Sequence, residues 1–187
     1  MACPVLTPAE AARILNDGGV VAYPTEAVYG LGCDPFNYDA VVRILDLKGR
    51  PESAGLILIA DEFSRVDDLI AEVSDAQLDR ALGTWPGPVT WLFPKSPLVP
   101  GWISGEHDSI ALRITDHPAC RELCAALGRG IVSTSANRSG QAPARIPADI
   151  EAAFGAAIDG IMTGELGGRE NPSEIRDIRT GEVVRPA

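Results

Sequence analysis

The stretch of residues 20–60 constrains the fold most strongly, because strand, glycine-rich and helical patterns follow one another closely there. Residues 20–23 form a short apolar run, and Pro24 ends this predicted strand, since proline cannot donate to a sheet ladder. Residues 30–32, Gly-Leu-Gly, predict a glycine-rich loop, where missing Cβ atoms permit tight turns or close backbone approach. This layout is typical of sites that hold a phosphorylated ligand.

The second half of this stretch predicts a helix, a basic turn and a buried strand. Asn37 or Asp39 can cap the helix. The helix ends at Lys48 and Arg50, two cations that flank a glycine. Residues 55–60 form a continuous apolar run, which suits a strand buried on both faces. The apolar face of the helix, at helical spacing, comprises Ala40, Val41, Ile44, Leu45 and Leu47.

Helical and strand patterns alternate along the chain, which favours an α/β fold with a mostly buried sheet. At 187 residues the chain is most simply one domain, residues 1–187. A helix capped by Thr7 opens the chain, with Pro8 and Glu10 at capping-box positions. Further helices are predicted within residues 61–82, 117–127 and 147–154, and strands at 89–94, 109–115, 131–132, 173–178 and 182–186, the last two as a hairpin.

Net charge argues against stable, general nucleic-acid binding. The chain carries 16 Lys and Arg against 26 Asp and Glu, a net charge of −10, and has no cluster of four or more basic residues.

No apolar run approaches the roughly 20 residues needed to span a bilayer, and the N-terminus does not read as a secretory signal. We therefore expect a cytoplasmic protein without membrane contact.

The four cysteines do not resemble a disulfide framework in a chain of this length. Cys120 and Cys124 lie four apart on a predicted helix, with His117 three residues earlier. No second ligand pair stands nearby, which favours buried thiols over a zinc site. We therefore predict no protein-held metal.

Several standard mechanisms are disfavoured by missing motifs. No G-x-x-x-x-G-K-[ST] phosphate loop occurs, and Pro35 stands where a dinucleotide fingerprint needs its third glycine. There is no G-x-S-x-G elbow, and only two histidines are available as bases. A site of cations, hydroxyls and glycines remains, which suits nucleotidyl or phosphoryl transfer.

The candidate binding residues also have structural interpretations. Lys48 and Arg50 can hold phosphate or carboxylate oxygens, or simply complement a helix dipole. Arg113 interrupts an apolar strand, so it either faces solvent or is held by an anionic partner. Residues 133–140, rich in Ser and Asn, form either a ligand site after a strand or a plain turn. Trp85 and Trp91 could stack on a base, but large aromatic residues beside a turn are more often part of the core. Residues 97–107 predict a loop that can serve as a flap.

The motif set resembles the YrdC/TsaC family of threonylcarbamoyl-AMP synthases. PTEAVYGLG at residues 24–32 is followed by a K-x-R-P turn at residues 48–51 and a buried strand. STSANRSG at 133–140 and NPSEIRD at 171–177 extend the resemblance, in order, over nearly the whole chain. It implies a single YrdC-like domain, with a twisted mixed sheet flanked by helices and a concave ligand-binding face.

The resemblance also implies an activity and its partners. Members of this family make threonylcarbamoyl-AMP from L-threonine, bicarbonate or carbon dioxide, and ATP, releasing diphosphate. A separate transferase complex then modifies the adenosine beside the anticodon of certain tRNAs. Mg²⁺ is expected to accompany ATP, because diphosphate leaves as a polyanion. Direct contact with tRNA is expected to be weak at most.

Carried onto this chain, the resemblance assigns residues to roles. Lys48 and Arg50, the K-x-R pair, are expected on the nucleotide phosphates and the developing charge. The nucleotide is further expected to contact Ser109, Ser135, Asn137 and Arg185, and threonine to contact Thr25, Arg113, Ser133 and Ser173. Three departures concern the threonine pocket: Ala27 stands where many relatives have threonine, Ile59 where many have histidine, and Ser173-Glu174-Ile175 where they have S-T-V.

Two other functions remain open at this point. An RNA-binding or ribosome-maturation module could use the same concave face around Lys48 and Arg50, although the net charge of −10 counts against it. A related carbamoyl-transfer or sugar-phosphate reaction is disfavoured by the S-x-N pair and by the lack of an acidic metal motif.

Overall fold

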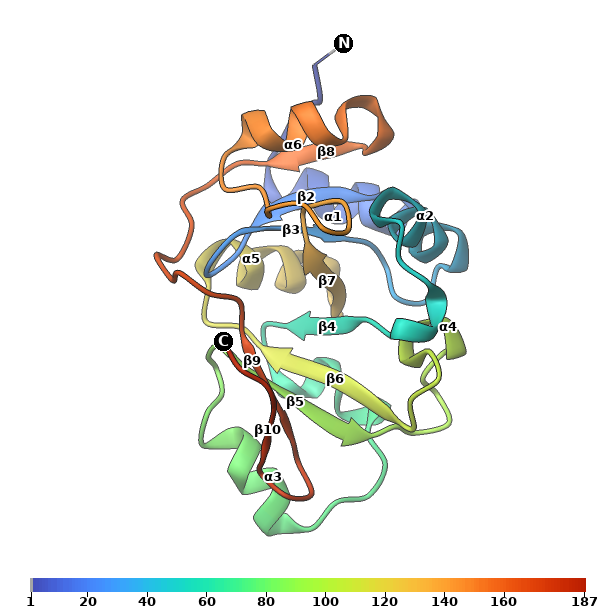
Figure 1. Cartoon of the computed structure of the whole chain (residues 1–187), viewed down its shortest axis with the longest axis vertical. Coiled ribbons are helices and arrows are strands. Elements are labelled where there is room, and N and C mark those ends of the chain that lie inside the picture. Colours follow the sequence, from blue (N-terminus) through green and yellow to red (C-terminus); the bar gives the residue numbers. More distant parts are fainter. Residues whose placement is uncertain (1) are drawn as a thin grey trace.

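The computed structural model describes residues 2–187 and forms a ten-stranded mixed sheet in the order β1-β8-β2-β3-β7-β4-β6-β5-β9-β10 (Figure 1). The pairs β1–β8, β8–β2, β4–β6 and β5–β9 are parallel, and the other neighbours are antiparallel. The strands are β1 (Val5–Leu6), β2 (Val21–Pro24), β3 (Tyr29–Gly32), β4 (Ile57–Ala60), β5 (Val89–Pro94), β6 (Ser109–Ile114), β7 (Ile131–Ser135), β8 (Gly160–Met162), β9 (Glu174–Asp177) and β10 (Val183–Arg185).

Helices cover the sheet, which confirms the predicted α/β class with a mixed sheet flanked by helices. The helices are α1 (Pro8–Asn16), α2 (Tyr38–Lys48), α3 (Asp75–Leu82), α4 (Gly101–Ser104), α5 (Pro118–Leu127) and α6 (Pro147–Ala153). Short 3₁₀ turns lie at Glu52–Ala54, Phe63–Arg65, Asp67–Leu69 and Gly155–Ala157. None of the described helices is long and apolar enough to cross a membrane.

Two apolar clusters bury both faces of the sheet. Along β2, Val21 and Tyr23 belong to the cluster that α1 and α5 cover, whereas Ala22 belongs to the cluster that α2 covers. In β4, Leu58 and Ile59 divide between the two clusters in the same way. Successive side chains of a strand point to opposite faces, so a continuous apolar run marks a strand covered on both sides.

Local sequence signals place the first two helices as predicted. Thr7 caps α1 through a complete capping box with Glu10. Asn37 caps α2 by accepting a hydrogen bond from the backbone of Ala40. Gly49 follows α2 in the left-handed region at φ 62°, which ends the helix and turns the chain back toward the sheet.

The predicted glycine-rich loop at residues 30–32 is wrong, because these residues form β3 and pair antiparallel with β2. The predicted close approach is nevertheless present. A Cβ atom on Gly32 would lie 2.7 Å from both the Tyr23 ring and the carbonyl oxygen of Val132. Glycine therefore serves here to bring β3 against a buried ring and the neighbouring β7, rather than to form a loop.

The helix predicted within residues 61–82 is largely wrong. Two 3₁₀ turns and an extended segment occupy residues 63–73, and only α3 is α-helical. Ser74 starts α3 with a capping box to Gln77, while Ile70 bridges to Lys95 beside the sheet. This pairing opposes helix formation before Ser74.

Three other predictions from the sequence can be compared with the structure. Trp85 and Trp91 are buried in the core, as favoured. Residues 97–107, expected to be a loop, contain α4, whose Ile103 is fully buried and accepts a backbone hydrogen bond from Leu56. The hairpin of β9 and β10 is confirmed, whereas the short strands β1 and β8 were not predicted.

Candidate functional site

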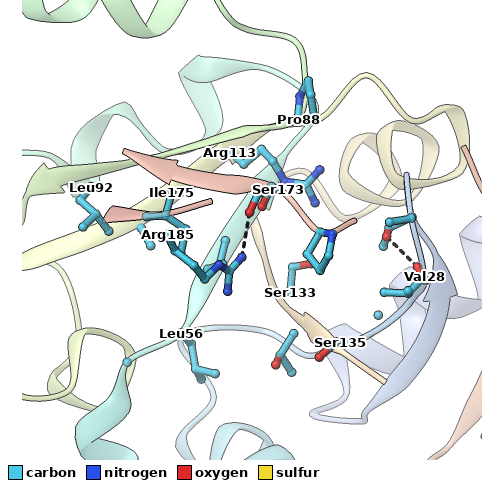
Figure 2. Close-up of a pocket in the computed structure, with 18 of the residues that line it drawn as sticks. Val28, Leu56, Pro88, Leu92, Arg113, Ser133, Ser135, Ser173, Ile175 and Arg185 are labelled. Atoms are coloured by element: carbon cyan, nitrogen blue, oxygen red, sulfur yellow. Dashed lines mark hydrogen bonds between the residues drawn. The ribbon is translucent and has the colours of Figure 1, made fainter. Parts of the chain in front are cut away.

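A cavity of about 350 Å³ lies where the turn between β2 and β3 meets β6, β7 and the β9–β10 hairpin (Figure 2). Eight of the ten residues predicted for the site line it. They are Thr25, Arg50, Ser109, Arg113, Ser133, Ser135, Ser173 and Arg185. The sequence motifs thus converge on one cavity, although they are spread over most of the chain.

Lys48 and Asn137 do not line the cavity, but Lys48 donates hydrogen bonds to Asn137. The ammonium of Lys48 donates to the carbonyl oxygens of Ser135 and Asn137 and to Asn137 Oδ1. The Ser135 hydroxyl donates to the same Oδ1 atom at 2.6 Å. Burial, and then the neighbouring charge of Arg50, lower the pKa of Lys48 to about 8. In this conformation Lys48 holds the S-x-N turn in place.

Two arginines form a cationic side of the cavity. Arg50 donates to the carbonyl oxygens of Ala54 and Gly55, and Arg185 donates to the carbonyl oxygen of Ser173 at 2.8 Å, the contact drawn in Figure 2. Neither forms a salt bridge with a carboxylate among residues 2–187. Burial, and then repulsion from Arg185, lower the pKa of Arg50. Uncompensated neighbouring guanidinium groups favour a bound anion.

A buried ion pair also lines the cavity. Arg113 Nη1 contacts Glu26 Oε1, and the Thr115 hydroxyl donates to the same oxygen at 2.7 Å. Both charged side chains are only 8% exposed. Burial raises the pKa of Glu26, but the Arg113 charge and the hydrogen bonds from Arg113 and Thr115 outweigh it, and the net pKa is lowered. Of the two alternatives for Arg113, the structure shows the anionic partner.

The segment between β8 and β9, residues 163–173, runs along the left side of Figure 1 and closes one side of the cavity. Its backbone is fixed to the β2–β3 turn by hydrogen bonds from Gly167 to Thr25 and from Arg169 to Glu26. The Tyr29 hydroxyl also donates to the Gly164 carbonyl oxygen. Arg169 and Asn171 of this segment line the cavity.

Sequence reasoning did not predict several lining residues. Glu26 had a signal, because it lies in the PTEA motif directly beside Thr25, but its partner Arg113 is distant in the chain. Asn171 is the first residue of the NPSEIRD motif and Arg169 lies two residues before it, but neither had a separate signal. His107 reaches the cavity from the loop after α4, and nothing in its local sequence indicates that position.

The departures from the family pattern differ in their positions. Ala27 and Ile175 line the cavity, so they bear directly on a bound ligand. Ile59 does not line it and is fully buried in the cluster beneath α5. Cys120 and Cys124 are buried thiols, and residues 2–187 contain no group of three His, Cys, Asp or Glu placed to hold a metal.

Fold and site together define an α/β protein with a cavity that offers cations and hydroxyls to an anionic ligand. The family model described as "Telomere recombination", for Sua5, YciO and YrdC, matches residues 13–187. The chain belongs to this family. It is 54% identical over 178 residues, 95% of this chain and 96% of the relative, to a protein of Stutzerimonas stutzeri named threonylcarbamoyl-AMP synthase. A protein of Pseudomonas aeruginosa PAO1 with the same name is 53% identical, over 95% of both chains.

Solved structures of relatives share the fold. P. abyssi Sua5 complexed with L-threonine is 32% identical, with a TM-score of 0.89 over 96% of this chain. This chain spans about half of that longer protein, 53% of its length. E. coli YciO is 26% identical, with a TM-score of 0.84 over 95% of this chain and 87% of its own.

Proposed function

We propose that this chain is a threonylcarbamoyl-AMP synthase, a nucleotidyltransferase. It converts L-threonine, bicarbonate and ATP into L-threonylcarbamoyladenylate, diphosphate and water. The observation that carries the proposal is 52–54% identity, over about 95% of both chains, to proteins with that name. The cavity supports it, because its cations and hydroxyls suit a reaction driven by positioning and charge neutralisation.

The residue roles follow from which charges of the cavity are paired and which are not. Arg50 and Arg185 bind the phosphates of ATP, since both guanidinium groups lack a carboxylate partner among residues 2–187. Lys48 acts mainly by holding Ser135 and Asn137 in place beneath the nucleotide. The remaining predicted contacts keep their roles: Ser109 for the nucleotide, and Thr25, Arg113, Ser133 and Ser173 for threonine.

Mg²⁺ is proposed to enter with ATP rather than on protein ligands. Glu26 is the single carboxylate among the residues that line the cavity, and it is paired with Arg113. Such a donor set does not suit Mg²⁺, which prefers several oxygen ligands, usually carboxylates and substrate phosphates. The phosphates of ATP would therefore hold the ion, and it would offset charge on the departing diphosphate.

The direct test measures diphosphate release from ATP and Mg²⁺, with and without L-threonine and bicarbonate, using serine as a control substrate. We expect release only when both co-substrates are present. Arg50→Ala should remove this activity, whereas Arg13→Ala, on the exposed face of α1, should retain it. Release independent of threonine, or full activity in folded Arg50→Ala, would refute the proposal or the site assignment respectively.

The product is proposed to pass to a tRNA threonylcarbamoyl-transferase complex in the cytoplasm. A net charge of −10 disfavours strong direct tRNA contact, because phosphate contacts need compensating cations. A salt titration of tRNA affinity tests this point: a tight interaction with a steep dependence on salt would contradict it.

A further inference from the structure

Glu26 is the carboxylate among the residues that line the cavity, and the side-chain contacts to it end on one of its two oxygens. The Thr115 hydroxyl donates to Oε1, and Arg113 Nη1 contacts that same atom. No side chain of residues 2–187 donates a hydrogen bond to Oε2, and the one further group that stabilises the carboxylate is the backbone N–H of Glu26 itself. Oε2 is not sealed inside the protein either, since the buried side-chain atoms that lack a partner belong to other residues. A charged acceptor that is not sealed therefore belongs to a residue that lines the cavity.

Arg113 has a matching accessible donor. Its Nε is buried and without a hydrogen-bond partner, but Nη2 is not among the buried atoms, and it donates to no group of residues 2–187. Arg113 lines the same cavity as Glu26. The pair therefore presents one free acceptor and one free donor, of opposite charge, next to each other.

We propose that Glu26 and Arg113 together bind the two charged ends of an α-amino acid. Arg113 donates to the substrate carboxylate, and Glu26 Oε2 accepts hydrogen bonds from the substrate ammonium. This inference rests on the proposed function and deepens it. The family resemblance offered Arg113 for the carboxylate, and the role of Glu26 is the new assignment.

A paired site of this kind selects for zwitterions. The ion pair is nearly neutral as a unit, so a lone carboxylate gains attraction from Arg113 and loses it to repulsion from Glu26. A zwitterion makes two charge-assisted hydrogen bonds and leaves neither buried charge uncompensated. The same argument disfavours ATP phosphates next to Glu26 and favours them beside Arg50 and Arg185.

Two segments distant from each other in the sequence hold Glu26 in the orientation that this role needs. Its carboxylate is fixed by Thr115, directly after β6, and by Arg113 within β6. Its carbonyl oxygen accepts a hydrogen bond at 2.9 Å from the backbone of Arg169. A carboxylate fixed in this way is preorganised, so less free energy is lost when the substrate is ordered against it.

The test compares L-threonine with 3-hydroxybutyrate, which keeps the carboxylate and hydroxyl but lacks the amine. Calorimetric titrations are made with a non-hydrolysable ATP analogue present. Wild-type protein should bind threonine at least about tenfold more tightly than 3-hydroxybutyrate. Glu26→Gln should weaken threonine binding by a similar factor without weakening 3-hydroxybutyrate, and Glu122→Gln, on the exposed face of α5, should change neither.

Two results would overturn the inference. Equal loss of both ligands in Glu26→Gln would mean that Glu26 only holds Arg113 in place. Equal affinity of wild-type protein for the two ligands, or no threonine binding, would also overturn it, and this measurement does not depend on a variant that folds. Turnover is not needed, so threonine discrimination without diphosphate release would refute the proposed function and leave the amino-acid site intact.

Discussion

Replacing Gly32 with alanine would test how close packing in β3 supports the cavity. The new Cβ would lie 2.7 Å from Tyr23 Cε1 and 2.7 Å from the Val132 carbonyl oxygen, distances that real Cβ contacts do not reach. The Tyr23 ring is fully buried, and its hydroxyl already donates to that carbonyl oxygen, so it has no open space to enter. Overpacking of this kind costs about 1–3 kcal/mol, and two clashes with poorly movable groups favour the upper end.

The magnitude can be measured by thermal unfolding with two matched glycines. In a chain of this size about 2–4 °C of Tm corresponds to 1 kcal/mol, so Gly32→Ala should lower Tm by about 4–12 °C. Gly30→Ala, with nearest contacts of 3.2 and 3.3 Å, should lower it less. Gly101→Ala meets nothing within 4 Å and lies in α4, where alanine is the better helix former, so Tm should hold or rise.

Diphosphate release should fall with Gly32→Ala as well, because Val132 immediately precedes Ser133 on β7. A displacement of β7 to relieve the clash would move Ser133 and Ser135 relative to the rest of the cavity. An unfolding temperature for Gly32→Ala equal to that of Gly101→Ala would refute the reasoning, since it would mean that the strands separate without cost.

Three further predictions concern charge and capping. Burial lowers the pKa of Lys48 to about 8, so the rate of diphosphate release should fall as pH rises through that value. Lys48→Arg stays protonated in this range and should keep its rate. A wild-type rate that does not change across this range would contradict the prediction. The pKa of Glu26 is lowered below its usual 4.5, so the contribution of Glu26 to stability is present above that pH and is lost as pH falls. In denaturant titrations, Glu26→Gln should lower the free energy of unfolding by about 3 kcal/mol at neutral pH and by progressively less in acid. Thr7→Ala should lower the unfolding free energy by about 1 kcal/mol through loss of the α1 cap and leave activity unchanged, as calorimetry and the diphosphate assay would show.

Features that depend on neighbouring residues could be predicted from the sequence. Caps at Thr7 and Asn37 and the turn at Gly49 are determined within a few residues, and the structure has each of them. Most predicted site residues line the cavity for a related reason. The motifs that contain them stand beside predicted strands, and Ser133 and Ser135, for instance, lie on β7 at the cavity wall.

Features that depend on distant residues could not be predicted. Gly-Leu-Gly reads as a loop because glycine weakens isolated strands, and only packing against Tyr23 and β7 makes it β3. The partnership of Glu26 with Thr115 joins residues 89 positions apart. Lys48 was expected to point at phosphates, but its hydrogen bonds run to the S-x-N turn, and only the folded chain places these groups together.

Under the proposed function, the charge distribution of the cavity favours one arrangement of the two substrates. Arg50 and Arg185 lack carboxylate partners among residues 2–187, whereas Glu26 neutralises Arg113. A polyanion placed against Glu26 would be repelled, and an amino acid between Arg50 and Arg185 would leave its ammonium facing two cations. The favourable arrangement therefore puts the phosphates beside the free arginines and the amine beside Glu26. In the proposed reaction the carbamate would then form between them, next to the phosphate that it must attack.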